Sequence, residues 1–200
     1  PQVLDAVQIP VVAAGGFADG RGLAAALAFG AHGIAMGTRF LMTKESPVPQ
    51  ATKERYVAAT TDDIFVTDRL DGLPQRMIRN RFTARLEKTG RLSMLMTALS
   101  SALTLKRISG ARASELLRSA LRMARGGDAS FSQALLAASA PVLIRRAIEE
   151  GRPDEGVMAT GQIAGRLTDL PTCEELVSRI VREAEERLEA LCRARGEAGG

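Results

Sequence analysis

The sequence predicts an α/β fold in which parallel strands alternate with helices. Two short apolar runs, Ile9–Ala14 and Gly33–Met36, lie on either side of an alanine-rich stretch from Leu23 to Phe29. A glycine follows each run directly. A strand, a helix and a second strand within about thirty residues form a βαβ unit, whose strands are parallel and whose crossover is right-handed.

The first strand and the helix after it carry clear end signals. Ile9–Ala14 is a continuous apolar run, which is typical of a strand buried on both faces of a parallel sheet. Asp19 offers an N-cap side chain for the helix, and Gly30 is placed to end it. Residues 1–7 are expected to be the end of a further helix.

More elements follow this unit. Helices are expected over residues 47–60, 115–124 and 130–150, and a short β-branched strand over Ile64–Thr67. Leucine and methionine recur at helical spacing from Leu92 to Leu103, which gives an apolar stripe suited to packing against other helices or another subunit.

The last helix opens on a capping box formed by Thr172 and Glu175, directly after Pro171. Its apolar positions are expected to face one way. They are Leu176, Ile180, Ala184, Leu188 and Leu191.

Composition limits the class of protein. The chain has 200 residues, with 27 Lys plus Arg against 23 Asp plus Glu and a net charge of +4. This length suits one domain, or a domain with an appendage, and is short for a complete eight-stranded α/β barrel of about 250 residues. The modest charge does not demand a nucleic-acid partner. The basic run from Arg76 to Arg91 has only Phe82 as a stacking surface, so a solvated face is expected.

No stretch predicts a membrane span or a signal peptide. The charge-free stretch Ser93–Leu105 is interrupted by Ser and Thr and falls below the ~18 apolar residues that a spanning helix needs. Cys173 and Cys192 both lie in the C-terminal segment. A reducing, cytoplasmic setting is therefore expected.

The strongest chemical signal is a pair of glycine-bearing turns at the ends of the two predicted strands, in Val11–Gly16 and Ala35–Phe40. Because neighbouring parallel strands end at one edge, backbone N–H groups converge there, and glycine lets a ligand approach them. Each turn also faces a helix start, which favours an anion. In an α/β barrel this is the phosphate site after strands seven and eight. The plainer alternative is that the glycines only make tight turns.

A rival interpretation is a dinucleotide fold, because Gly20–Ala25 formally matches the pattern G-x-G-x-x-A. Its position argues against this. The match lies several residues beyond the strand end, and the second strand ends in Met36-Gly37-Thr38 without a carboxylate for a ribose.

These runs resemble the nitronate monooxygenase family, formerly called 2-nitropropane dioxygenases, whose motifs also occur in flavin-dependent enoyl-carrier-protein reductases. The resemblance is carried by Ile9–Gly22 and Gly30–Phe40. It extends to Asp71–Pro74 with Arg76, Arg79 and Asn80, and to Ala159–Gly165, and it is weak between Leu86 and Gly127.

The resemblance implies the C-terminal part of an FMN-containing TIM (β/α)8 barrel with an added helical subdomain. On this division, residues 1–70 hold the last βα units and residues 71–160 a mostly helical insertion or cap. Residues 161–195 hold a flavin-proximal loop and the C-terminal helix, and residues 196–200 a loose tail. The implied reaction is oxidation of alkyl nitronates by molecular oxygen.

The resemblance also implies that main-chain groups hold the FMN phosphate while a late loop approaches the flavin. The cofactor-binding residues so implied are Gly15, Gly16, Ala35, Met36, Gly37, Thr38, Gly161 and Gln162. No catalytic residue is expected here, because the family's histidine base would precede Pro1.

Four other side chains need a role: those of His32, the two cysteines and Arg39. His32 precedes its strand, at the edge opposite the flavin, so a surface or satisfied histidine is expected. Without a second His, and with cysteines that lack His partners, metal binding is not expected. Arg39 either neutralises a phosphate or pairs with a carboxylate.

Three functional hypotheses remain. The first is FMN-dependent oxidation of a small nitronate by oxygen. The second is a flavin-dependent reductase of acyl-carrier substrates. The third is a noncatalytic module whose helices mediate association, for example into a homo-oligomer.

Overall fold

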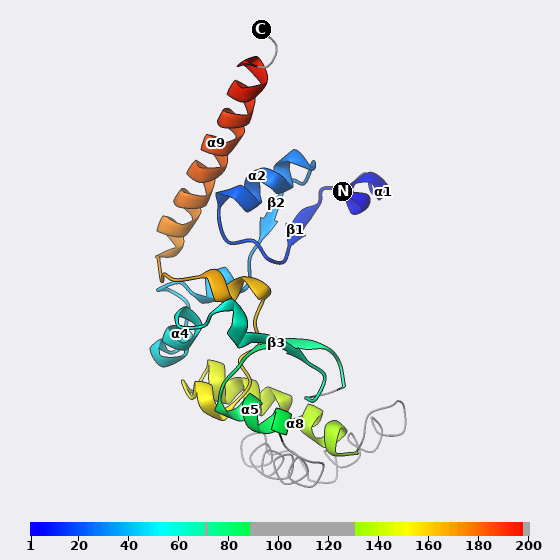
Figure 1. Ribbon diagram of the computed structural model, residues 1–200, viewed down its shortest axis with the longest axis vertical. Coiled ribbons are helices and arrows are strands. Elements are labelled where there is room, and N and C mark those ends of the chain that lie inside the picture. The colour runs from blue at the N-terminus through cyan, green and yellow to red at the C-terminus, as the bar shows by residue number, and fades with distance from the viewer. Residues whose placement is uncertain (71, 89–130, 198–200) are drawn as a thin grey trace.

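The computed structural model describes residues 1–70, 72–88 and 131–197 (Figure 1). In the view of Figure 1 the upper part holds a two-stranded sheet and three helices. These elements are α1 (Gln2–Ala6), β1 (Val12–Ala14), α2 (Gly20–Ala28), β2 (Gly33–Ala35) and α9 (Cys173–Glu197).

The lower part is built on a hairpin covered by helices. Its elements are α4 (Gln50–Val57), η1 (Thr61–Asp63), β3 (Ile64–Thr67), β4 (Gln75–Ile78), α5 (Arg81–Lys88), α8 (Phe131–Ile148) and η2 (Pro153–Glu155). Two short helices, α3 (Thr38–Leu41) and η3 (Gln162–Arg166), lie between the two parts.

The predicted βαβ unit is confirmed. β1 and β2 are parallel, with Ala14 opposite Ala35. The Asp19 carboxylate caps α2 by accepting the N–H of Gly22 at 3.2 Å, and Gly30 follows the helix with a φ of 98°. Burial of the first strand is wrongly predicted, since Val12 is 58% exposed. The reason is that β1, among the described strands, pairs with β2 alone and leaves its other edge open.

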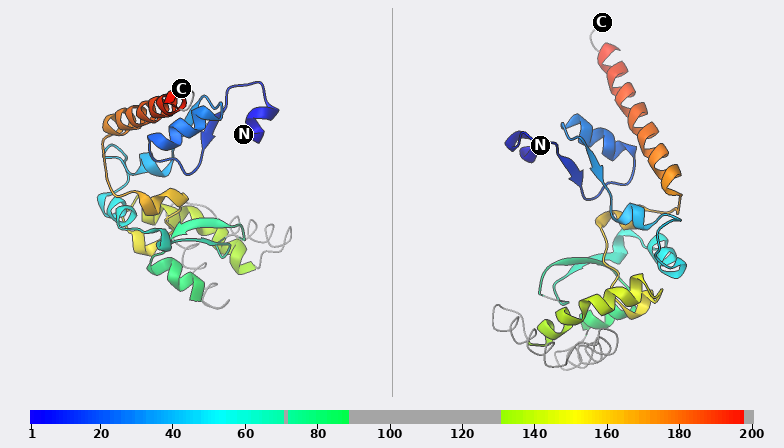
Figure 2. Two further views of the ribbon diagram at one scale, coloured as in Figure 1. Left: turned by 45° about the horizontal axis from the view of Figure 1, so that its top comes forward. Right: turned by 180° about the vertical axis from the view of Figure 1, so that it is seen from behind.

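The helix α9 runs along α2, as both figures show (Figure 2). Its predicted capping box is confirmed, because the Glu175 N–H donates to Thr172 Oγ1 at 3.1 Å and the Thr172 N–H donates to the Glu175 carboxylate at 2.7 Å. The stripe is buried at its start, whereas Leu191 near its end is 63% exposed. The helix continues to Glu197, so the first residues of the expected loose tail are helical.

The hairpin in the lower part is antiparallel, with Ile64 opposite Ile78. The strand Ile64–Thr67 has its predicted bounds. The strand β4 is not predicted, and it lies in the segment expected to be mostly helical. The segment before η3 extends this sheet, since Met77 bridges Ala159 and the Ile78 N–H donates to the Met158 carbonyl at 3.0 Å.

The main core lies under this hairpin and reaches η3. The predicted helices over 47–60 and 130–150 are present as α4 and α8 and contribute to it. Tyr56 of α4 is fully buried, and its hydroxyl donates to the Ala159 carbonyl at 2.7 Å. The buried members are Met42, Tyr56, Ala59, Ile78, Ala147, Met158, Ala164 and Leu167.

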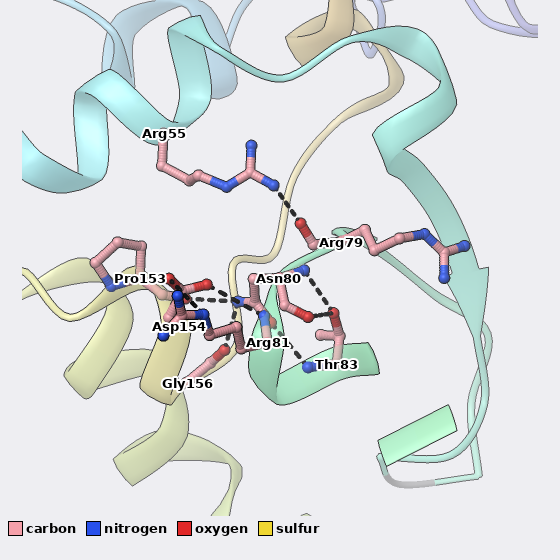
Figure 3. Close-up of polar contacts among 8 residues, drawn as sticks. All are labelled: Arg55, Arg79, Asn80, Arg81, Thr83, Pro153, Asp154 and Gly156. Carbon is pink, nitrogen blue, oxygen red and sulfur yellow. Dashed lines mark hydrogen bonds and ion pairs between the residues drawn. The ribbon is translucent and has the colours of Figure 1, made fainter. Parts of the chain in front are cut away.

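A buried asparagine joins α5 to η2 (Figure 3). The amide nitrogen of Asn80 donates to the carbonyls of Pro153 at 2.6 Å and Gly156 at 2.9 Å. Its amide oxygen accepts the N–H of Thr83 at 2.8 Å, which caps α5. Asn80 therefore fixes the entry of the chain into α5 against the loop that leads to the candidate site.

Some predictions fall outside the described ranges. They are the helix over 115–124, the stripe from Leu92 to Leu103, and the residues Asp71 and Arg91. None of the described helices is long and apolar enough to cross a membrane.

Candidate functional site

The two glycine turns leave the β1–β2 pair at the same edge. Since the strands are parallel and Ala14 is opposite Ala35, Gly15-Gly16 and Met36-Gly37 follow side by side. Gly15 has a φ of 103° and Gly16 a φ of 80°, values that L side chains rarely adopt. The two turns therefore lie next to each other, and their use as an anion site stays a prediction.

The space in front of the turns is open. A Cβ added at Gly15, Gly16 or Gly37 would meet no atom within 4 Å. Within the described part of the chain, the N–H groups of Gly16 and Gly37 donate to no other residue. Unpaired donors beside open space suit a ligand with several acceptor oxygens, such as a phosphate.

The late loop reaches the second turn through one hydrogen bond. The N–H of Gly161 donates to Thr38 Oγ1 at 3.0 Å, and a Cβ at Gly161 would lie 3.1 Å from that oxygen. Because the Thr38 hydroxyl accepts this bond, its own proton remains available as a donor. Gln162, the next residue, is exposed at the start of η3.

The structure thus brings the predicted binding residues to one edge of the sheet. We call this set the glycine cradle. It comprises Gly15, Gly16, Ala35, Met36, Gly37, Thr38, Gly161 and Gln162.

Arg39 pairs with a carboxylate, the second of its two predicted roles. It is 1% exposed, and its guanidinium donates to the Asp169 carboxylate at 2.7 Å and to the Asp169 carbonyl at 3.3 Å. Burial lowers the pKa of Arg39, although Asp169 opposes the shift. Arg179 of α9 binds the same carboxylate at 2.8 Å. This bridge ties α3 to α9 through the loop after η3.

A pocket of about 670 Å³ lies beside the cradle, between the starts of α2 and α9 and the segment 163–169. Four arginines and three carboxylates line it, and we call it the arginine pocket. They are Arg21, Arg39, Arg166, Arg179, Asp19, Asp169 and Glu183. Of the cradle residues, Gly16 alone lines this pocket.

Sequence reasoning does not find this pocket. Arg39 and Asp169 are 130 residues apart, and no spacing rule connects them. The capping box at Thr172 locates the start of α9, yet nothing in the sequence shows that α9 lies against α2.

The rival dinucleotide interpretation does not fit this geometry. The N–H of Gly20, at the start of α2, donates to the Glu183 carboxylate at 2.8 Å. A side-chain carboxylate thus occupies a donor that a pyrophosphate would need.

We assign His32 and the two cysteines no role in the cradle. His32 is exposed and its Nδ1 accepts the N–H of Val11 at 3.4 Å, at the edge of the sheet opposite the cradle. Cys173 and Cys192 form no disulfide. The described residues contain no cluster of His, Cys, Asp and Glu suited to a metal ion.

Comparison with known proteins agrees with the resemblance seen in the sequence. The profile of the family described as nitronate monooxygenase matches residues 1–183. The (3aS,4S,5R,7aS)-5-hydroxy-7a-methyl-1-oxo-octahydro-1H-indene-4-carboxyl-CoA dehydrogenase of Rhodococcus jostii is 46% identical over 96% of this chain and 54% of its own length. A probable nitronate monooxygenase of Staphylococcus haemolyticus is 44% identical over 44% of this chain and 25% of its own length.

Solved structures give the same picture. FabK from Thermotoga maritima superposes with a TM-score of 0.63 and 30% identity, covering 96% of this chain and 50% of that protein. The chain spans about half the length of the curated relatives that match most of it.

Proposed function

The chain belongs to the nitronate monooxygenase family, and from this premise we propose that it forms the FMN-phosphate-binding part of a flavin-dependent oxidoreductase. The observation that carries the proposal is the glycine cradle, where two open glycine turns and the Thr38–Gly161 contact meet at one edge of parallel strands. In TIM barrels the phosphate lies after strands seven and eight. We assign β1 and β2 to those strands.

The residues of the cradle fit the phosphate of FMN. The N–H groups of Gly16 and Gly37 and the hydroxyl of Thr38 are donors beside open space. Any side chain at Gly16 would both require an unfavourable φ and enter that space. The exposed amide of Gln162 is the group of η3 that we assign to the flavin ring.

FMN, when bound, would accept electrons from the substrate carbon. The described chain contributes binding and orientation to this chemistry. We assign no described residue to proton removal, because His32 lies at the opposite edge and the pocket carboxylates Asp19 and Asp169 are held by arginines.

For the substrate we propose a coenzyme A thioester. The likeness that supports it is the one to the carboxyl-CoA dehydrogenase, which extends over 96% of this chain, whereas the likeness to the Staphylococcus nitronate monooxygenase extends over 44%. The family description supports an alkyl nitronate as the second candidate. The two candidates share their chemistry, since a carbonyl or a nitro group stabilises negative charge on the neighbouring carbon.

The test is anaerobic reduction of the flavin in the purified protein. We expect stoichiometric FMN, loss of its visible absorbance with a cyclic hydroxyacyl-CoA thioester, and no loss with propyl-2-nitronate. Reduction of the flavin by the nitronate, and not by the thioester, would favour an alkyl nitronate as the substrate. A protein that consumes NADH with an enoyl thioester would favour the reductase hypothesis, and a protein without flavin would contradict the proposal.

A further inference from the structure

The arginine pocket is lined by a buried arginine that the fold holds in place. Arg39 is 1% exposed, and its Nε has no hydrogen-bond partner among the described residues. Its other guanidinium nitrogens are held by Asp169. A buried donor without a partner is uncommon in proteins. Arg39 therefore adds a fixed positive charge to the wall of this pocket, while its Nε lies beneath the accessible surface.

The charges of the pocket do not cancel. Asp19 pairs with Arg21, Asp169 pairs with both Arg39 and Arg179, and Glu183 accepts the N–H of Gly20. Arg166, which is exposed, forms no ion pair within the described ranges. Four arginines against three carboxylates leave an excess positive charge. Guanidinium groups bind phosphate with matched geometry, so a phosphate is the ligand group that this arrangement suits.

The pocket is distinct from the glycine cradle in most of its residues. It shares Gly16 with the cradle, and its other lining residues belong to residues 18–22, to Arg39, to the segment 163–169 and to α9. Its volume of about 670 Å³ exceeds what one phosphate fills and falls in the ~300–1,000 Å³ range of small-molecule sites. One of its lining residues, Gly16, follows the carboxyl end of β1, the edge at which substrates of parallel α/β proteins bind.

We propose that the arginine pocket binds the phosphate-bearing nucleotide end of a coenzyme A thioester, with Arg166 as the donor to its phosphates and Arg39 as a fixed positive charge on the pocket wall. The inference rests on the proposed function, because it takes the substrate class from there. The inference adds to the proposed function the site at which the coenzyme A part of the substrate binds. A nitronate has no such end and would leave the pocket unused.

The test compares coenzyme A with pantetheine, which lacks the nucleotide and its phosphates. Affinities are measured by calorimetry on the flavin-loaded protein, for the wild type, Arg166→Gln and Arg193→Gln. Arg193 is the matched control, since it is an exposed arginine of α9 outside the pocket. We expect Arg166→Gln to weaken coenzyme A binding about tenfold, as loss of a charged hydrogen bond does. Pantetheine binding and flavin content should not change, and Arg193→Gln should behave as wild type.

Three results would overturn the inference. They are a wild type that binds coenzyme A no better than pantetheine, an unchanged coenzyme A affinity in Arg166→Gln, and a loss of flavin from Arg166→Gln, which would assign the pocket to the FMN phosphate. Failure of the proposed function looks different. In that case coenzyme A binding would depend on Arg166, while no thioester would reduce the flavin.

Discussion

Glycines serve two separate needs in this chain. Gly15 and Gly16 have positive φ and face open space, so glycine at these positions permits the turn and lets a ligand approach the backbone. Gly20 and Gly165 face backbone instead, and a Cβ at Gly165 would lie 2.5 Å from the Thr61 nitrogen. No pattern in the sequence separates these two kinds of glycine, and only the packing shows which of them face open space and which face backbone.

Gly16→Ala tests the binding role. The positive φ costs an L residue about 1 kcal/mol, and the new methyl group enters the space assigned to the phosphate. We expect a slightly less stable protein that binds FMN at least about tenfold more weakly, which is ~1.4 kcal/mol. FMN titration measures the affinity, and urea unfolding measures the stability. Gly33→Ala is the control, because Gly33 also faces open space but lacks a positive φ. Equal FMN affinity in both variants would count against the cradle.

Asn80→Ala tests the joint between α5 and η2. The change removes the cap of α5 and leaves the carbonyls of Pro153 and Gly156 without their donor. We expect a loss of about 2–3 kcal/mol in the free energy of unfolding. Arg81→Ala, at the next residue, should cost less than about 0.5 kcal/mol, because Arg81 is 82% exposed and its ion pair is long. Similar unfolding midpoints for the two variants would show that the hydrogen bonds of Asn80 between α5 and η2 do not stabilise the protein.

At the scale of elements, prediction succeeds where a local signal exists. Asp19, Gly30 and the Thr172–Glu175 box mark helix ends through contacts within a few residues, and all three have their predicted places. The strand β4 escapes prediction because it has only two apolar residues, Met77 and Ile78, and these lie between Arg76 and Arg79. Seven residues separate Thr67 from Gln75, more than the hairpin patterns cover, so the dipeptide Asp71-Gly72 does not by itself indicate the antiparallel pair.

The contact of α2 with α9 depends on Gly20. In an isolated helix, Gly→Ala gains about 1 kcal/mol of propensity. Here the Cβ would lie 2.5 Å from the Ala184 nitrogen and 2.6 Å from the Ile180 carbonyl, so α9 would have to move. Because such overpacking costs about 1–3 kcal/mol, we expect Gly20→Ala to destabilise the protein despite the better propensity. Thermal unfolding measures this, and an increase in Tm would contradict the packing described here.

At the scale of the whole molecule, the α/β class follows from the sequence, whereas the burial of β1 does not. An apolar run predicts a strand covered on both faces, yet it does not say which segment covers it. The arginine pocket is similarly hidden, because it forms only when α2, α9 and the segment after η3 come together. Long-range packing of this kind leaves no periodic signal in one sequence.

The pH dependence of stability is also a property of the whole molecule. The N–H and hydroxyl of Thr60 hold the pKa of Asp63 below its usual 3.8, and the N–H of Thr172 holds the pKa of Glu175 below its usual 4.5. Burial raises the pKa of Asp19, but hydrogen bonds from Arg21 and Gly22 outweigh it and lower that pKa overall.

Since these pKa values are lower in the folded state, the unfolded chain takes up protons first as the pH falls. We expect urea midpoints that are constant above pH 5 and fall below about pH 4.5, where the usual values lie. Asp63→Asn should show a shallower fall than the wild type. A midpoint that rises on acidification would contradict the assigned hydrogen bonds.

The most direct test of the account compares FMN with riboflavin, which lacks only the phosphate, in the wild type and in Thr38→Val. The preference for FMN over riboflavin isolates the energy of the phosphate contacts. We predict a preference of at least about a hundredfold in the wild type, from several charged hydrogen bonds. In Thr38→Val this preference should fall about tenfold, because the hydroxyl no longer reaches the phosphate, whereas the lost Gly161 bond should affect FMN and riboflavin alike. A wild type that binds the two equally, or a variant that loses both equally, would contradict the claim that the glycine cradle holds the phosphate.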